Sequence, residues 1–521
     1  ERSMMRRKLV SSVGLGAGTV LLAASLAWSC GGGNQDGGSQ YKGSSEGGTS
    51  SGATSSGGTY GDGAPGDGSY SGDSDLNFGT CTNLASCQVT CADGGTTSLS
   101  GYVYDPAGKN PLYNVVVYIP TTPVKAITSG ASCDQCGGEV TGNPLVTALT
   151  DATGHFVLND VPVGVQLPLV MQLGKWRRQV TIPAAKACAN TVLSDKTLTR
   201  LPATQAEGNI PLIAVTTGGA DPLECLLRKV GIKDSEFTTA GGTGRVQLYA
   251  GGGVDAGGTF VQIPTSTFAS TVNGGSAFAS ATPLWSSATN LEAYDIVLLA
   301  CEGAQDPEDK PSGSFQAMDA FERAGGRVFM SHWQDIWIED GPAPLPSTGV
   351  WTDWQAPPPS PTPGTLDTSF PKGQAFHDWL QNVGALDSSG QLDIYQSKGN
   401  LNTVGGGAQQ WVSLANSASI YQDGSAPDPG VTAVQYMSFN TPLDVDASAQ
   451  CGRVVYSDLH VSAGVKSDAG TGAVIGDQTG QPFPTGCVTT DLSPQEKALE
   501  FMLFDLSSCI QSDTMTPMPP M

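Results

Sequence analysis

Four residues in the second half of the chain have side chains suited to catalysis or ligand binding: Cys301, His332, Asp458 and His460. A thiol within hydrogen-bond reach of an imidazole can act as a nucleophile. The two histidines with the carboxylate can instead transfer protons, and the two imidazoles can jointly bind a metal or another ligand. Alternatively, both histidines are hydrogen-bonded polar groups at strand ends. The sequence leaves these interpretations open.

A predicted strand–helix–strand unit positions the first two of these residues. Residues 296–300 form a short unbroken apolar run, which is typical of a strand covered on both faces of a parallel sheet. A helix is expected over 314–324, and the chain returns to the sheet at 328–330. Reactive loops of such units lie at the carboxyl ends of the strands. The loop after the second strand carries His332 and Trp333, a further candidate for ligand binding.

Strands and helices continue to alternate beyond this unit. Residues 245–250 and 452–456 are further predicted strands, and helix signals recur between them and after them. The pattern predicts a flavodoxin-like α/β domain with a mostly parallel sheet over residues 216–512. A Pro-rich insertion over 341–372 emerges beside the candidate site and can act as its lid. Residues 513–521 are expected to be a disordered tail.

The preceding part of the chain has a β pattern. Short apolar runs separated by turn signals over residues 98–215 predict an all-β sandwich of the Ig or transthyretin-like kind. Residues 79–97 form a Cys-rich lead-in. Within the sandwich, Cys133 and Cys136 form a CxxC motif in a hairpin excursion. Because this motif does not start a helix after a strand, we expect a structural disulfide and not a redox pair.

Charge and cysteine content limit the classes of partner. The chain has 521 residues and a formal net charge of −23, from 48 acidic and 25 basic residues. Phosphate binding needs clustered Lys and Arg, so this balance argues against a nucleic-acid partner. If Cys30 is lipidated, 11 of the 12 cysteines remain, and at least one thiol has no intrachain partner.

The N-terminal residues 1–30 resemble a bacterial lipoprotein signal peptide. A basic stretch at 4–8 precedes the uncharged apolar run 9–28, as in a secretory signal. Cys30 is the expected lipidation site, and the Gly/Ser-rich residues 31–78 are expected to be a disordered tether. These features predict a lipid anchor, with the chain in the cell envelope facing the periplasm or the exterior. An uncleaved signal anchor and a freely secreted protein are the alternatives.

Residues 98–185 resemble the carboxypeptidase regulatory-like (transthyretin-like) sandwich. The matching features are Gly101-Tyr-Val-Tyr-Asp105, the Pro111-Leu112 step before a Val-rich strand, Thr150-Asp-Ala-Thr-Gly154-His-Phe156 and Val161-Pro-Val-Gly164. The resemblance implies an accessory or binding module that has no catalytic residues of its own.

Residues 240–510 resemble the class I glutamine amidotransferase-like fold, especially its trehalose-utilisation (ThuA-like) branch. The resemblance rests on Tyr294-Asp-Ile-Val-Leu-Leu299, Ala324-Gly-Gly-Arg-Val-Phe-Met-Ser-His332 and Gly452-Arg-Val-Val-Tyr-Ser-Asp-Leu-His460. Active members place a nucleophilic cysteine on a sharp elbow after a strand, with a histidine and an acid after a later strand. Here His332 occupies the elbow, so the nucleophile is missing, whereas His460 stands where the family's histidine would, with Asp458 beside it.

Together these features predict a cell-envelope lipoprotein that displays a binding or adhesion-type module for carbohydrate or a surface polymer. One alternative is an extracytoplasmic ThuA-like hydrolase or isomerase that acts on a sugar-like substrate through His332, Asp458 and His460. The other is a non-catalytic structural surface protein. Because the elbow has no cysteine, we favour a protein without catalytic activity, and we expect neither a resident cofactor nor a metal.

Overall fold

The computed structural model describes most of the chain from residue 81 onwards. The described ranges are 81–92, 94–138, 140–218, 221–254, 260–261, 268–272, 275, 277–352, 361–395, 397–415, 432–461, 481–484, 487 and 490–520. The predicted signal peptide, the lipidation site Cys30 and the tether lie outside these residues. All described residues belong to one compact unit, Gly68–Met521. Within them, no helix has both the length and the apolar character needed to cross a membrane.

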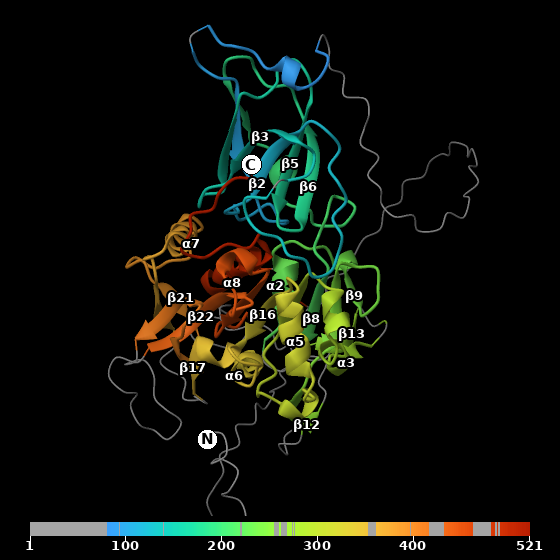
Figure 1. Cartoon of the computed structure of the whole chain (residues 1–521), viewed down its shortest axis with the longest axis vertical. Helices are drawn as coiled ribbons and strands as arrows, with labels where there is room; N and C mark the ends of the chain where they lie inside the picture. The colour runs from blue at the N-terminus through green and yellow to red at the C-terminus, as the bar shows by residue number, and fades with distance from the viewer. Residues whose placement is uncertain are drawn as a thin grey trace, which may run out of the picture. The chain divides into compact units, whose positions relative to one another are not determined.

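Two small sheets form a β-sandwich-like region in the part of the chain where a sandwich was predicted (Figure 1). Their strands are β1 (Ser98–Tyr102), β2 (Val116–Pro120), β3 (Pro144–Leu149), β4 (His155–Asn159), β5 (Leu167–Leu173), β6 (Trp176–Ile182) and β7 (Asn190–Leu193). One sheet has the order β4-β1-β7 and the other β3-β2-β5-β6. Side chains from both sheets, including Leu99, Phe156, Val117 and Met171, share one apolar core.

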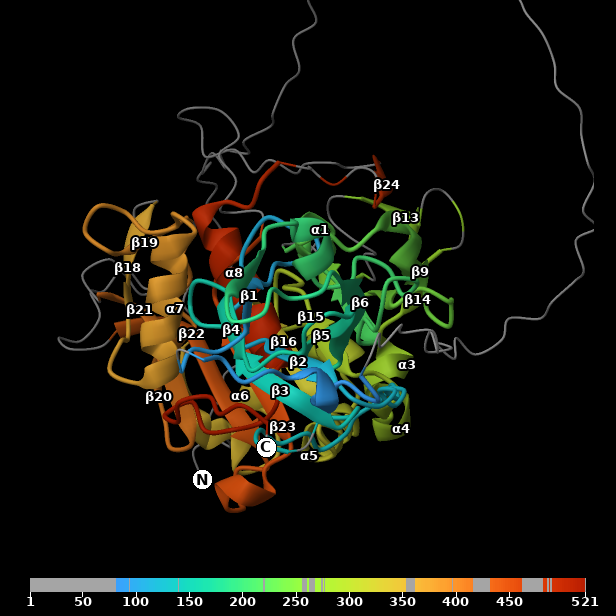
Figure 2. The ribbon, with the colours of Figure 1, turned by 90° about the horizontal axis from the view of Figure 1, so that it is seen from above.

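The largest sheet in the described residues is part parallel and part antiparallel. Its strand order is β14-β10-β8-β15-β16-β23-β22-β21-β18-β19, with β9 beside β10. Strands from β14 to β23 run parallel, and those from β22 onwards are antiparallel to their neighbours. Figure 2 shows β18, β19 and β21 together at one side of the sheet. The strands are β8 (Ile213–Thr217), β9 (Phe237–Thr239), β10 (Val246–Ala250), β14 (Ala279–Ser280), β15 (Ile296–Leu299), β16 (Arg327–Ser331), β18 (Thr362–Leu366), β19 (Leu392–Ile394), β21 (Ala408–Ala415), β22 (Thr432–Thr441) and β23 (Gly452–Ser457).

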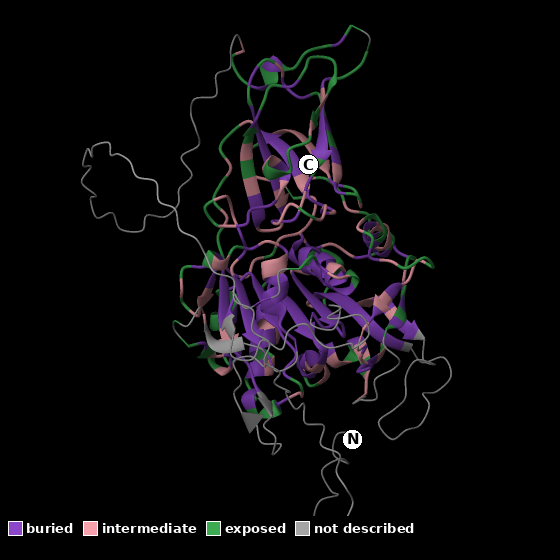
Figure 3. Cartoon of the chain, turned by 180° about the vertical axis from the view of Figure 1, so that it is seen from behind, coloured by how far each residue is buried: buried purple, intermediate pink, exposed green. Residues whose placement is uncertain are grey.

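Helices cover both faces of this sheet. Successive residues of a strand point to opposite faces, and β15 shows the result: Ile296 and Leu298 lie in one apolar core with α2, α7 and α8, whereas Val297 and Leu299 lie in a second core with α3 to α6. The strands at the centre are therefore buried throughout (Figure 3). The helices are α2 (Leu223–Lys229), α3 (Thr282–Trp285), α4 (Ala288–Glu292), α5 (Ser314–Arg323), α6 (Ile336–Glu339), α7 (Pro371–Asn382) and α8 (Pro494–Ser507).

Short elements connect the strands and helices. The 3₁₀ turns are η1 (Ala85–Cys87), η2 (Asp234–Glu236), η3 (Pro307–Asp309), η4 (His332–Asp335), η5 (Leu345–Thr348) and η7 (Ala447–Ala449), and α1 is a single turn (Lys196–Thr199). Three two-stranded ribbons pair β11 (Gly253–Val254) with β12 (Phe260–Val261), β13 (Phe268–Val272) with β24 (Gln481–Phe483), and β17 (Gly349–Trp351) with β20 (Leu401–Val404).

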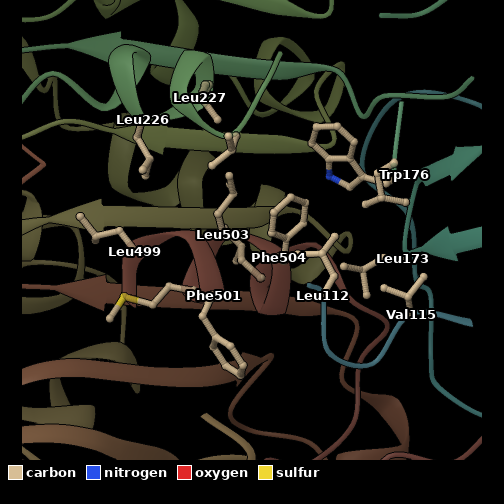
Figure 4. Packing of buried hydrophobic residues seen from close by; sticks show 14 of the residues in the cluster. Leu112, Val115, Leu173, Trp176, Leu226, Leu227, Leu499, Phe501, Leu503 and Phe504 are labelled. Carbon is tan, nitrogen blue, oxygen red and sulfur yellow. The ribbon is translucent and has the colours of Figure 1, made fainter. Parts of the chain in front are cut away.

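The core of the sandwich-like region is continuous with the core on one face of the large sheet. Helix α8 contributes Phe501 and Phe504 to it, and the ring of Phe504 lies 5.7 Å from that of Trp176 at the start of β6 (Figure 4). Burial of large apolar side chains is worth about 2–3 kcal/mol each. This shared core therefore holds the two regions together as one packed structure.

The CxxC motif forms structural disulfides, but not within itself. Cys133 pairs with Cys451 and Cys136 pairs with Cys509, across 318 and 373 residues of sequence. Both bonds join the excursion between β2 and β3 to the region of the large sheet. The expected structural role of these cysteines is thus met by two long-range bonds, because strand β23 and the end of α8 lie against the excursion. Cys301 is the one free thiol among the described cysteines, in agreement with the unpaired thiol that the count predicted.

Three predicted boundaries are wrong. The predicted sandwich, 98–215, extends into β8, which pairs with β10 and β15 at the centre of the large sheet. The predicted insertion, 341–372, contains β18, a strand of that sheet. The predicted disordered tail, 513–521, begins with the buried Asp513, which lies 2.9 Å from Arg453 in an ion pair. In each case a long-range partner, which the local pattern does not reveal, decides where the segment belongs.

Candidate functional site

The elbow after β16 is present, and His332 stands on it. Strand β16 ends at Ser331, and η4 begins at His332, so the chain turns sharply from strand to helix at this residue. His332 has φ 47°, in the left-handed region. For a residue other than glycine this conformation costs about 1–2 kcal/mol. Strain of this kind gathers at functional sites, where the surrounding structure holds the side chain in a required direction.

The imidazole of His332 lies between a thiol and an amide. Its Nδ1 is 3.3 Å from Cys301 Sγ, and its Nε2 is 3.2 Å from Asn400 Oδ1. The amide nitrogen of Asn400 donates to Asp335 Oδ2 at 2.9 Å, which leaves Asn400 Oδ1 facing the ring as an acceptor. The Nε2 atom of His332 therefore carries the proton, and Nδ1 offers its lone pair to the sulfur side.

His460 completes a cluster at the carboxyl ends of β15, β16 and β23. Its ring centroid is 5.1 Å from that of His332. The sulfur of Cys301 and one ring nitrogen of each histidine all lie within 4.8 Å of one another. The three donors are grouped because neighbouring parallel strands place their carboxyl ends together.

Asp221 connects the loops that carry the two histidines. One of its carboxylate oxygens accepts from Ser331 Oγ at 2.6 Å, and the other accepts from the backbone N–H of Val461 at 2.8 Å. Each donor is the immediate sequence neighbour of a histidine of the cluster. Asp221 follows β8 and is fully buried, so it fixes the spacing of the two loops from a third strand.

The other two predicted site residues lie beside the cluster. Asp458 is buried, one carboxylate oxygen accepts from the Tyr456 hydroxyl at 2.8 Å, and the other has no hydrogen-bond partner among the described residues. Burial raises the pKa of Asp458 to about 8. Trp333 is half-buried, with its ring centroid 4.9 Å from that of His332. The predicted residues are thus gathered in one place, apart from Cys30, which lies outside the described residues.

The electrostatics of the cluster argue against a cysteine nucleophile. Burial raises the pKa of Cys301 to about 12. Burial, together with the nearby charge of Lys398, holds the pKa of His332 well below its usual range, and burial lowers that of His460 to about 3. At neutral pH the site therefore holds a protonated thiol and two neutral imidazoles, whereas an activated cysteine needs a thiolate. Only 6% of His332 and 5% of His460 is exposed, so a substrate has little access.

A separate cavity of about 320 Å³ lies beside the sandwich-like region. It is bounded by the excursion between β2 and β3, by β5 and β6, and by residues of the C-terminal segment after α8. The side-chain oxygens of two lining residues, Gln172 Oε1 and Gln511 Oε1, are buried and have no hydrogen-bond partner among the described residues. The polar residues that line the cavity include Asn114, Lys125, Thr128, Asp134, Gln135, Thr141, Lys175 and Arg177.

Sequence reasoning missed the residues that orient the cluster. Asp335 ends η4 and Asn400 precedes β20, and neither belongs to a recognisable motif, so no local signal could have identified them. Asp221 was not among the predicted site residues. The signal that could have identified Asp221 is the short apolar run of β8. If this run is interpreted as a strand, Asp221 follows a strand end, as Cys301, His332 and His460 do. The cavity joins segments far apart in the chain and could not have been found from local patterns.

Comparisons with known proteins add little to this description. No known protein family and no curated protein matches the chain. Two solved structures are similar in part: they are interface mutants of a type II cohesin–X–dockerin complex from Acetivibrio cellulolyticus, with 15% and 16% sequence identity. Each match covers 29% of this chain and 81% of the other, with TM-scores of 0.15 and 0.12. Similarity at this level does not define the fold, so we rest no argument on it.

Proposed function

We propose that the chain is a lipid-anchored binding protein of the cell envelope, which holds a polyhydroxylated polymer such as a carbohydrate at the cavity beside the sandwich-like region. The observation that supports the ligand class is the pair of unpartnered amide oxygens in residues that line this cavity, Gln172 and Gln511. A buried acceptor without a partner costs about 1–3 kcal/mol. Both oxygens have almost no solvent-accessible surface. Rotation of the two glutamine side chains toward the cavity lets hydroxyl groups of a bound sugar donate to them and removes this cost.

The setting of the cavity also favours binding. Both Cys133 and Cys136 line it, and their disulfides hold one wall against the opposite one. A wall that is fixed before the ligand arrives loses less conformational entropy on binding. Lys125 and Arg177, which form no ion pair among the described residues, add positive charge to the lining of a strongly acidic protein, whereas Lys175 is paired with Asp295 at 2.6 Å. This charge favours a polymer with carboxylate or similar groups over a neutral one.

The α/β region serves as the scaffold in this proposal. Without the short edge strands β14 and β9, its parallel strands have the spatial order β10-β8-β15-β16-β23, which is 2-1-3-4-5 in chain order, as in flavodoxin-like folds. We infer that it is an amidotransferase-like domain whose elbow has lost its nucleophile. The sandwich-like region is, by its sequence resemblance, a carboxypeptidase regulatory-like module, which fits a role in binding and display.

An extracytoplasmic hydrolase or isomerase is the second candidate. The observation in its favour is that His332 and His460 converge, with ring centroids 5.1 Å apart and Asp458 two residues from His460. An enzyme of this kind needs the two imidazoles to reach a substrate, and their burial opposes that. Activity lost in His332→Ala and His460→Ala, with polymer binding retained, would favour this candidate.

Polymer binding by the full chain tests the proposal. The probes are soluble neutral glucans and uronic-acid polysaccharides, and affinity is measured by isothermal titration calorimetry. Loss of one hydrogen bond is worth about 1 kcal/mol, so Gln172→Ala and Gln511→Ala should each weaken binding roughly fivefold to tenfold. The matched control is Gln374→Ala on the exposed surface of α7, which should leave affinity unchanged. If no polymer binds, or if both cavity variants bind like the wild type, the proposed site is wrong.

The lipid anchor has its own test. Cys30→Ser should move the protein from the membrane fraction to the soluble fraction when cells are fractionated. Metabolic labelling with a radioactive fatty acid should label the wild type and not the variant. Label on both proteins would contradict lipidation at Cys30, without bearing on the cavity.

A further inference from the structure

We propose that Cys301, His332 and His460 form a binding site for a transition-metal ion, with Zn²⁺ as the reference ion. The three side chains come from loops after three neighbouring parallel strands, β15, β16 and β23. Their donor atoms lie within 4.8 Å of one another. None of the three residues lines the cavity assigned to the polymer, so this inference is independent of the proposed function.

The donor geometry is close to that of a zinc site. With Zn–S near 2.3 Å and Zn–N near 2.0–2.1 Å, tetrahedral donors lie about 3.3–3.6 Å apart. Cys301 Sγ and His332 Nδ1 are already 3.3 Å apart. The widest separation among the three donors, up to 4.8 Å, must shorten by about 1.2–1.5 Å to reach the same range. Three protein ligands then leave the fourth tetrahedral position open for water or another small ligand.

Hydrogen bonds direct the free lone pair of His332 into the site. A metal-binding histidine usually donates its other ring N–H to an acceptor, which fixes the ring and its tautomer. Asn400 Oδ1 is that acceptor here, at 3.2 Å from Nε2, and Asp335 in turn holds the Asn400 amide. The left-handed φ of His332 aims the ring in this direction, and the site gives a reason for the strain.

The surroundings of the other two donors also fit a metal ion. His460 Nε2 is buried without a hydrogen-bond partner among the described residues, which is a costly arrangement for a histidine packed in a core. The sulfur of Cys301 receives backbone N–H groups from Gly303 and Trp333. These N–H groups stabilise a thiolate, and a metal ion is the partner that would convert the buried thiol to one.

Buried carboxyl groups around the cluster can balance the charge of the ion. A divalent ion with one thiolate and two neutral imidazoles has a net charge of +1. Asp221 contacts the neighbours of both histidines, and Asp335 lies behind Asn400. The half-buried Lys398 is the cation whose charge acts on both histidines. On binding, the Cys301 S–H bond breaks, the sulfur–metal bond forms with the sulfur electron pair, and the proton passes to solvent.

Co²⁺ substitution tests the site in the full chain with its disulfides intact. After treatment with a chelator, the wild type should bind one equivalent of Co²⁺ and show thiolate-to-metal charge-transfer absorption in the near ultraviolet, which Zn²⁺ should displace. Cys301→Ser is nearly isosteric and should lose this band completely. His332→Ala and His460→Ala should weaken Co²⁺ binding by at least about 100-fold each.

The chain offers matched controls, because it has only four histidines in total. His155 lies on β4 against Tyr102, and His377 lies on α7 beside Asp378. His155→Ala and His377→Ala should bind Co²⁺ like the wild type and keep the band. Near-ultraviolet circular dichroism shows whether each variant is folded. Either of two results would overturn the proposal. One is a folded wild type that binds no stoichiometric Co²⁺, and the other is a charge-transfer band that persists in Cys301→Ser.

Asn400 is a positioning residue in this site. Asn400→Ala removes the acceptor for His332 Nε2–H without removing a ligand, and it should weaken Co²⁺ binding about 10–100-fold while the charge-transfer band survives at saturating metal. Asn400→Asp keeps an acceptor and should restore most of the affinity. Equal affinity in wild type and Asn400→Ala would show that the ring of His332 is not held for a metal.

Discussion

Replacement of Asp513 by alanine should destabilise the protein, because this carboxylate belongs to a buried ion network. Arg453 Nη2 lies 2.9 Å from Asp513 and 2.5 Å from Asp505, and Lys372 Nζ lies 3.0 Å from both carboxylates. Ser438 Oγ donates to Asp513 at 2.7 Å. Two cations and two anions thus balance each other away from solvent. Loss of one anion leaves a buried positive charge uncompensated.

Two arguments give the expected loss of stability in Asp513→Ala. Burial raises the pKa of Asp513, but the charges of Arg453 and Lys372 outweigh this and lower it from 3.8 to about 2. One pKa unit is worth about 1.4 kcal/mol, so the ionised carboxylate contributes about 2 kcal/mol. Removal of one partner from a buried ion pair typically costs about 3–5 kcal/mol. We therefore expect Asp513→Ala to lower the free energy of unfolding by about 2–5 kcal/mol.

Urea denaturation of the full chain, followed by tryptophan fluorescence, measures this effect. Trp411 is a suitable reporter because its indole N–H donates to Ser438 Oγ, a member of the same network. The control is Asp444→Ala, whose exposed carboxylate pairs with Arg323 on the surface and should leave the midpoint unchanged. Since the pKa of Asp513 is lowered, its contribution is complete above pH 3.8 and is lost as the pH falls towards 2.

A midpoint for Asp513→Ala equal to that of Asp444→Ala would refute the reasoning. It would mean that the C-terminal segment does not pack against β22 and β23 in solution. A further check is the double variant Lys372→Met with Asp513→Leu, which removes one charge of each sign. It should recover most of the stability lost in the single variant, because apolar side chains of similar size replace buried ions at little cost.

Two further predictions concern buried groups near the site. Burial raises the pKa of Glu224 from 4.5 to about 8, so the folded state retains a proton that the unfolded state releases, and stability falls as the pH rises from 4.5 to about 8. Glu224→Gln should therefore raise the Tm measured by calorimetry at pH 8 and hardly change it at pH 4.5. A constant difference in Tm between the wild type and Glu224→Gln across this pH range would contradict the prediction. The buried Cys301 thiol should not react with Ellman's reagent in the native metal-free protein, and unfolding should expose one more thiol in the wild type than in Cys301→Ala. Rapid reaction of the native thiol would show that the cluster is open to solvent.

Local elements were predictable where the signal lies within a few residues. The apolar runs of β15, β16 and β23 were recognised because strands buried on both faces need unbroken apolar sequence. Ser493 and Glu496 have the spacing of a capping box, a local signal for the start of a helix, and they form that box at the start of α8. The central strand β8 was missed because its five residues adjoin the β-rich region, and nothing local shows that they pair with β10 and β15.

The sequence alone identified the chemically capable side chains of the site and placed them at strand ends, since both properties depend on residue type and nearby apolar pattern. It also identified His332 as the residue on the elbow. Only the tertiary structure decided which of these side chains meet. The order β15-β16-β23 brings Cys301, His332 and His460 together, although 128 residues separate the two histidines in the sequence. That order, like the disulfides across more than 300 residues, results from packing of distant segments on a shared core, which no local pattern encodes.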